Sequence, residues 1–244
     1  MIADILTVFW KEMKEILIQG PKFRGGWVGT LIFLGVFGVL MPLQSGLSWL
    51  TSPLTLLVWA WVPFLLVNSV TADSFAGERE RHTLETLLAS RLSDRSILFG
   101  KLASSLAYGW GLTLVCLLLS VLTINAVHWQ GYPVVFPISI TIGILVLSFL
   151  VAMLAAGLGI LVSLRASTVR QAQQTLSAMM FVVLIPLIAL PMLPEGLRST
   201  VGLALVTANL NQIALVAAAA LALIDTGLLG IAMARFRRSQ MILD

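Results

Sequence analysis

The segment 77–101, GERERHTLETLLASRLSDRSILFGK, concentrates charged side chains between two apolar runs. Glutamates and arginines surround the leucines Leu84, Leu87 and Leu88. Apolar anchors flanked by ions of both signs are typical of a surface that docks another protein, because the apolar contacts supply affinity and the ions fix the register. We therefore interpret the segment as a docking surface. It holds nine of the 26 charged residues: Glu78, Arg79, Glu80, Arg81, Glu85, Arg91, Asp94, Arg95 and Lys101.

The other reactive side chains do not form a site. The single cysteine, Cys116, lies within an apolar run, where a thiol packs as a small hydrophobe, and it cannot form an intrachain disulfide. His82 and His128 are not arranged as a metal or haem site, so we expect each to be an ordinary surface or interface residue. We expect the chain to bind no metal and no cofactor.

The pair Gly100-Lys101 is not the end of a phosphate-binding loop. Such a loop needs a glycine five residues before the Gly-Lys pair and Ser or Thr directly after it. This chain has Arg95 and Leu102 at those positions. We therefore expect no ATPase activity and no other enzymatic activity in this chain.

The composition is that of an integral membrane protein. Of the 244 residues, 59% are hydrophobic and 11% are charged, and the mean hydropathy is +1.00. Soluble domains have about 25% charged residues. The excess of basic residues does not indicate nucleic-acid binding, because these residues lie between apolar runs and not on a soluble face.

Six apolar stretches predict an all-α transmembrane domain over residues 1–244. A helix that crosses the hydrocarbon core needs about 20 mainly apolar residues, and each stretch reaches or approaches that length. The predicted spans are 27–43, 53–72, 97–124, 134–164, 174–193 and 212–234.

The distribution of Lys and Arg predicts the orientation of these spans. Basic residues accumulate in cytoplasmic loops, and six spans place fourteen of the fifteen on one side, with Arg198 opposite. The prediction is a multi-pass protein of the cytoplasmic membrane with both termini in the cytoplasm. The loops 43–51, 125–133 and 194–211 then face outward.

The first 20 residues predict a helix on the cytoplasmic membrane surface. Apolar residues recur at helical spacing, charged residues occupy the other side, and Gly20-Pro21 ends the pattern. The alternative is an element of a small soluble bundle. We expect no cleaved secretory signal, because charged residues precede the first apolar run. The apolar face consists of Ile2, Ile5, Leu6, Phe9, Met13, Ile16 and Leu17.

Within the charged segment, residues 78–90 predict a short amphipathic helix on the cytoplasmic side. Ser93 is positioned to cap the third span by accepting a hydrogen bond from the backbone, and Asp94 complements the helix dipole. The alternative is a solvated loop that obeys the positive-inside rule. That rule does not account for Glu78, Glu80 and Glu85.

Residues 73–101 resemble the first cytoplasmic loop of ABC-2 type transporter permeases. The resemblance rests on an acidic residue at the end of span two, then Gly-Glu-Arg-Glu, Thr-Leu-Glu-Thr-Leu-Leu and a terminal Gly-Lys. The surface helix and the six spans extend it over the whole chain.

The resemblance implies a permease subunit of an ATP-driven exporter. Such a subunit dimerises with a second permease copy or a paralogue and binds two copies of a separate ATPase, which carries ATP and Mg²⁺. The loop then forms a coupling helix that inserts into the ATPase. The implied contact residues are Glu78, Arg79, Arg81, Thr83, Leu84, Glu85, Leu87 and Leu88.

Polar residues inside the predicted spans are the remaining candidates. Asp225 lies near the middle of span six, where an ionisable group is a functional hypothesis. As a functional residue, Asp225 would face the transport path, bind a cation or accept a proton. As a structural residue, it would pair with a polar side chain of a neighbouring helix. Asn68 and Thr71 of span two line the pathway or the dimer interface, or satisfy themselves locally.

The outer segment 194–211 is too short and too polar to cross the bilayer. Its many apolar residues and the prolines before it favour a re-entrant segment over a plain external loop.

Two other functions stay open. The chain would be an ion- or proton-coupled secondary transporter that uses Asp225, or a membrane assembly subunit that transports nothing. A secondary transporter usually has several intramembrane charges, whereas this chain shows one carboxylate. An assembly subunit does not need six spans.

Overall fold

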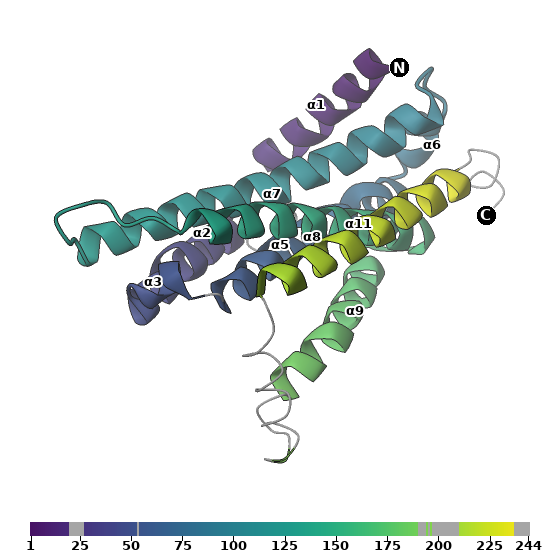
Figure 1. Cartoon of the computed structure of the whole chain (residues 1–244). Helices are drawn as coiled ribbons and strands as arrows, with labels where there is room; N and C mark the ends of the chain where they lie inside the picture. The colour runs from purple at the N-terminus through teal and green to yellow at the C-terminus, as the bar shows by residue number, and fades with distance from the viewer. Residues whose placement is uncertain (20–26, 53, 190–193, 195, 197–209, 237–244) are drawn as a thin grey trace.

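The computed structural model describes residues 1–19, 27–52, 54–189, 194, 196 and 210–236, and this part of the chain is helical with no strand (Figure 1). The predicted all-α fold class is confirmed for these residues. The helices are α1 (Ile2–Gln19), α2 (Trp27–Gly35), η1 (Val36–Leu40), α3 (Met41–Ser45), α4 (Ser48–Thr51), α5 (Leu54–Glu80), α6 (Leu84–Leu88), α7 (Asp94–Val127), α8 (Ile138–Arg165), α9 (Val169–Ala189) and α11 (Leu210–Arg235).

Five helical stretches in the described residues are long and apolar enough to cross a membrane: Val28–Ser45, Thr55–Glu80, Asp94–Val127, Ile138–Arg165 and Gln212–Arg235. They overlap the predicted spans one, two, three, four and six. The predicted fifth span, 174–193, begins within α9, and its last residues, 190–193, lie outside the described residues. A sixth span therefore stays a prediction, as does the re-entrant segment 194–211, most of which is also outside the described residues.

Helix α5 is the centre of the bundle and packs most extensively on α8. Thr71 of α5 lies against Gly159 of α8, where there is no room for a side chain. One turn away, the Ser163 hydroxyl accepts hydrogen bonds from the backbone N–H groups of Phe75 and Ala76, at 3.0 and 2.9 Å, and donates one to the Ala72 carbonyl. A side chain of α8 is thereby joined to the backbone of α5 near its charged end.

The first span contains one π-helical turn, η1. We attribute this turn to Pro42, which follows it in the chain. Proline has no N–H, so the Gly38 carbonyl loses the hydrogen bond it would accept in an α-helix. The Met41 N–H bonds instead to the Val36 carbonyl, five residues back. The Thr123 hydroxyl of α7 donates to the Gly38 carbonyl at 2.9 Å, so the displaced acceptor holds the first span against α7.

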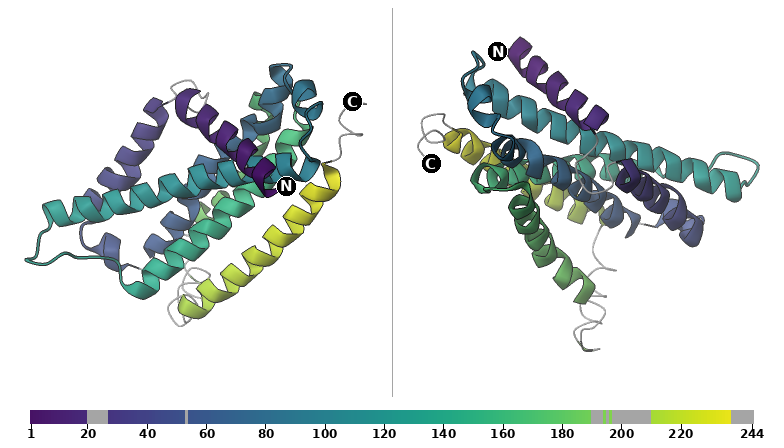
Figure 2. Two further views of the ribbon diagram at one scale, coloured as in Figure 1. Left: turned by 90° about the horizontal axis from the view of Figure 1, so that it is seen from above. Right: turned by 180° about the vertical axis from the view of Figure 1, so that it is seen from behind.

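Helix α1 lies along the first half of α7 (Figures 1 and 2). It turns Val8 and Glu12 inward, 3% and 8% exposed, and leaves Ile2, Leu6 and Trp10 open. The exposed apolar residues fit the predicted surface helix, but the inward face contains a carboxylate, which the amphipathic pattern did not indicate.

The prediction of a single helix over residues 78–90 is wrong in its bounds. Residues 78–80 belong to α5, the chain turns at Arg81–His82, where His82 has φ of 56°, and α6 covers only Leu84–Leu88. The predicted cap of α7 is confirmed, because the Ser93 hydroxyl accepts from the Ser96 N–H at 3.2 Å.

All ten Lys and Arg residues within the described ranges lie at one end of the bundle, on α1, at the end of α5, around α6, in the first two turns of α7, around the α8–α9 connection and at the end of α11. We call this the basic end. It agrees with the predicted one-sided distribution of charge.

We predict that Gly109→Ala destabilises the protein, because a methyl group there would collide with Val67 of α5. The expected loss is about 1–3 kcal/mol, typical of overpacking. Thermal unfolding in detergent measures it.

Gly111→Ala on the same helix is the matched control. A methyl group at this position has no atom within 4 Å, so helix propensity alone acts and stability should stay constant or rise by up to about 1 kcal/mol. Equal losses in the two variants would contradict the close packing of α5 on α7.

Candidate functional site

A buried ammonium group joins three helices at the basic end. The Lys101 side chain of α7 is 1% exposed. Its Nζ donates to Glu12 Oε1 of α1 at 2.8 Å, to the Ser74 carbonyl of α5 at 2.8 Å, and to Glu78 Oε1 of α5 at 3.5 Å. The same Nζ lies 5.3 Å from the centre of the Phe75 ring. This side chain is therefore a shared donor for α1 and α5.

A second lysine completes the cluster from α1. Lys11 Nζ lies 3.0 Å from Glu78 Oε1, 3.5 Å from Glu12 Oε1 and 3.6 Å from Glu15 Oε1. Partial burial by itself would lower the pKa of Lys11, but the carboxylates of Glu12, Glu78 and Glu15 outweigh it and raise that pKa. Lys11 is therefore charged at neutral pH. We call Lys11, Glu12, Glu15, Glu78 and Lys101 the ionic cluster.

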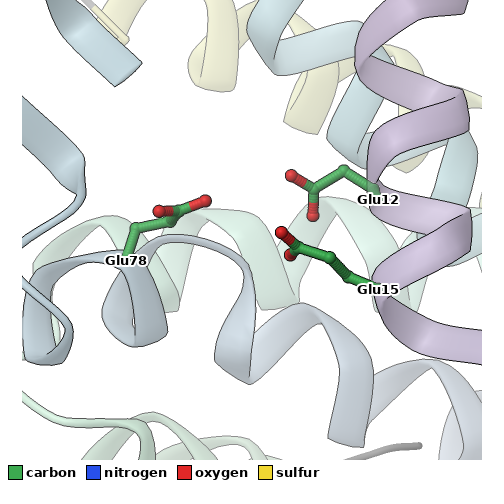
Figure 3. Close-up of side chains that lie close together, drawn as sticks. All are labelled: Glu12, Glu15 and Glu78. Atoms are coloured by element: carbon green, nitrogen blue, oxygen red, sulfur yellow. The ribbon is translucent and has the colours of Figure 1, made fainter. Parts of the chain in front are cut away.

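Figure 3 shows Glu12 and Glu15 projecting from α1 toward Glu78 of α5. One oxygen of each carboxylate lies within 4.8 Å of the others, close enough to share a cation. The nearby cations are the ammonium groups of Lys101 and Lys11, which bond to these same oxygens. The geometry is therefore that of an ion-pair network supplied by the chain itself.

The residue before Lys101 explains how α1 comes so close. A side chain at Gly100 would lie 2.6 Å from Cβ of Val8 and 3.2 Å from the Ile5 carbonyl. Glycine lets α1 rest on the backbone of α7, and the next residue then reaches Glu12. In the Gly-Lys pair that ends the charged segment, Gly100 therefore makes the helix contact and Lys101 makes the ion pair.

The remaining charges of the segment bind the end of α5 to its other neighbours. Arg79 donates to the carbonyls of Leu164 and Ala166 at the end of α8. Glu80 Oε1 accepts from the Val169 N–H, the first residue of α9, at 3.0 Å. The α8–α9 connection is therefore held from both sides by consecutive residues of α5.

Arg81 turns back to Asp73 and pairs with its carboxylate. The two residues are eight apart on and beyond α5, and Gly77 lies between them at a position where a side chain would collide with both. The acidic residue and the glycine of the charged segment therefore form one local ion pair.

Several side chains predicted to contact an ATPase point into the protein. Glu78 is 5% exposed, and Thr83 donates its hydroxyl hydrogen to Glu78. Leu84, 8% exposed, belongs to the apolar core, and Leu87 packs against that core. Of the predicted contacts, Thr83 and Glu85 are exposed, and the Leu88 side chain lies outside the described residues.

The exposed face of the loop is mostly different from the predicted leucine stripe. It consists of His82, Thr83, Glu85, Thr86, Ala89 and Arg91. We call these residues the loop face. Of these six, Thr83 and Glu85 were predicted to contact an ATPase, and that contact stays a prediction.

The predicted polar residues of the spans are not brought into one group. Thr71 is fully buried and donates to the Val67 carbonyl at 3.0 Å, while Asn68 is partly buried and its side-chain oxygen has no partner among the described residues. Asp225 is 2% exposed, and both of its carboxylate oxygens lack a partner within the same part of the chain. The Thr71 hydroxyl also donates to the Asn68 carbonyl at 3.3 Å, whereas no hydrogen bond joins Asp225 to either residue among the described residues.

Sequence reasoning counted Lys101 among the charges of the cytoplasmic side and did not single it out, although Lys101 lies inside the predicted span 97–124. The rule that an ionisable residue within a span marks a special site applies to it as it does to Asp225. Its partner Glu12 had no signal in the sequence, because α1 and α7 are far apart in the chain and their contact is tertiary.

We predict that Lys101→Met destabilises the protein by about 3–5 kcal/mol, because it leaves the Glu12 and Glu78 carboxylates buried without their main cation. Chemical denaturation in detergent measures the loss. Adding Glu12→Gln should recover part of it, since the double variant has one less uncompensated charge.

Lys14→Met on the exposed side of α1 is the control for Lys101→Met and should change stability by no more than about 0.5 kcal/mol. A similar loss in both variants would show that the cluster contributes no more than surface charge.

A protein-family model matches more than half of the chain. Residues 50–205, more than half of the 244, match the family model described as ABC-2 family transporter protein. No curated protein and no solved structure matches the chain significantly. The matched region contains α5, α6, α7, α8 and α9 with the whole charged segment, whereas α1 and α11 lie outside it. The chain belongs to the ABC-2 family of transporter membrane proteins.

Proposed function

We propose that this chain is the permease subunit of an ATP-driven exporter, with the ATPase on a separate chain that docks at the basic end. Membership of the ABC-2 family supports this proposal. The permease has six spans and pairs with a second permease copy or a paralogue, and each permease binds one ATPase subunit. ATP and Mg²⁺ are bound by the ATPase.

The basic end supports the proposed orientation. The ten described Lys and Arg residues lie there, and positive residues accumulate on the cytoplasmic side. We place the loop face, α1 and both termini in the cytoplasm, where ATP is available to the ATPase.

The observation that carries the proposal is how firmly the loop is joined to the helices behind it. Glu78 connects the end of α5 to α7 through Lys101 and to α1 through Lys11. Arg79 and Glu80 connect the same turn to α8 and α9. A push on the loop would therefore pass through α5 to four further helices by direct hydrogen bonds and ion pairs, as a rigid-body coupling requires.

The docking surface in this proposal is the loop face and not the leucine stripe. Leu84 and Leu87 fix the loop to the core, so they position it. Glu85 and Arg91 then supply opposite charges for the register of an ATPase cleft, beside the small exposed side chains Thr86 and Ala89.

A second candidate function is ion-coupled transport through Asp225. The observation that favours it is the buried carboxylate without a partner among the described residues. An unpaired carboxylate in the membrane is costly, and such residues often bind protons or cations during transport.

We predict that the double variant Glu85→Arg and Arg91→Glu abolishes copurification of the ATPase while the permease still inserts and folds. Reversing both charges opposes the register, and both side chains are exposed, so the core is unaffected. The measurement is the amount of P-loop ATPase and of Mg-ATP hydrolysis that purifies with the tagged permease from native membranes.

Gln130→Arg, an exposed substitution at the opposite end of the bundle, is the control and should leave the complex intact. Undiminished ATPase recovery with the charge-reversed loop would contradict docking at this face. Absence of any P-loop ATPase from the wild-type preparation would contradict the proposed function itself.

We predict that Asp225→Asn keeps ATP-dependent transport and does not lower stability, because a neutral amide of the same size is easier to bury than an unpaired carboxylate. Thermal unfolding and substrate-stimulated ATP hydrolysis in proteoliposomes test it. If the variant loses transport that is driven by an ion gradient without ATP, ion-coupled transport is the correct function.

A further inference from the structure

A cavity of about 390 Å³ lies between α8, α9 and α11 at the basic end. Figure 1 shows α9 leaving the bundle at an angle beside α8 and α11. Two arginines line the cavity, Arg165 as the last residue of α8 and Arg235 as the last residue of α11. This volume lies within the range of about 300–1,000 Å³ that small-molecule sites have.

The lining changes from charged to apolar along the helices. Helices α8 and α11 run toward the basic end and reach it at the two arginines, and α9 starts there, with Gln171 and Thr175 in the cavity wall. One or two turns farther from that end, the wall is apolar. Its apolar residues are Leu158, Leu161, Val162, Met179 and Ile231.

The side chains of Arg165 and Arg235 are not used in contacts that hold the described helices together. Both side chains are exposed, and neither makes an ion pair or a side-chain hydrogen bond within the described residues. Arginine at a helix end commonly bonds to the last carbonyls, but Arg79 already donates to those of Leu164 and Ala166. The nearby carboxylate of Glu80 accepts from the Val169 N–H. Two positive charges therefore face one cavity without an anion from this part of the chain.

Helices α9 and α11 also carry large exposed apolar side chains outside the cavity, as helices in contact with lipid do. Phe181 and Ile185 of α9 and Leu223 and Ile224 of α11 are large, exposed apolar side chains. An occupant that is anionic at one end and apolar at the other fits this lining along its whole length. A free phosphate would leave the apolar part empty.

We propose that this cavity binds an anionic phospholipid of the leaflet at the basic end. The headgroup phosphate lies between Arg165 and Arg235, and one acyl chain passes along Leu161, Met179 and Ile231 into the bilayer. Basic pockets between spans on the cytoplasmic side are suited to anionic headgroups, because arginine forms charge-assisted hydrogen bonds with phosphate. The site involves neither the ionic cluster nor the loop face, so it stands whether or not an ATPase docks there.

Lipid titration of the purified protein tests the proposal. Phosphatidylglycerol is added in mixed micelles, and bound lipid is counted by native mass spectrometry. We expect one site, and we expect Arg165→Gln and Arg235→Gln each to raise its dissociation constant about tenfold, which corresponds to about 1.4 kcal/mol. Met179→Trp should weaken binding with both arginines present, because it fills the apolar end.

Arg170→Gln is the matched control. Arg170 is an exposed arginine in the first turn of α9 that does not line the cavity, so its loss should leave lipid binding unchanged. Equal weakening in this variant would overturn the proposal in favour of general surface charge.

Three further results would overturn it. Binding of phosphatidylcholine as tight as that of phosphatidylglycerol would show that the arginines do not select charge. Protection against unfolding by glycerol phosphate alone, equal to that by the lipid, would identify a free anion as the occupant. A shift from dimer to monomer in Arg165→Gln or Arg235→Gln, without loss of lipid, would assign the cavity to a second copy of the chain.

Discussion

The arrangement of the basic end depends on one buried cation. The ammonium group of Lys101 has almost no access to solvent, and Glu12, Glu78 and the Ser74 carbonyl surround it. A buried pair of this kind adds little net stability compared with apolar packing, but breaking it is expensive. Its effect is therefore to specify one arrangement, in which α1, α5 and α7 meet at fixed positions.

The buried ion pairs also change how the charged segment 77–101 is interpreted. The alternation of acid and base looks like a solvated surface made for a partner, yet Glu78, Arg79, Glu80 and Arg81 all have partners inside the chain. These ions hold the loop rigid. Rigidity is what a mechanical connection needs, because a flexible loop would absorb displacement and not transmit it.

Charged side chains and small polar side chains have different roles in the packing of the helices. At the basic end, each carboxylate of the ionic cluster lies beside a lysine, whereas two arginines face the cavity between α8, α9 and α11. Along the helices, close contact depends on glycine, as at Gly109 and Gly159, and on hydroxyl groups such as Ser163. Without a hydrophobic driving force between helices in lipid, such close packing and hydrogen bonding are what hold spans together.

The sequence by itself determined five of the six predicted spans, the one-sided placement of charge, the cap at Ser93 and the family, because these depend on local composition and on spacing along one helix. It did not determine which side chains face inward at the loop, since the leucine stripe at Leu84 and Leu87 would suit a partner protein or the core equally well. Tertiary structure decided that, and it also brought Glu12 to Lys101 and Arg165 to Arg235. Such pairs are set by how distant helices pack, and helical periodicity carries no information about which helix lies opposite.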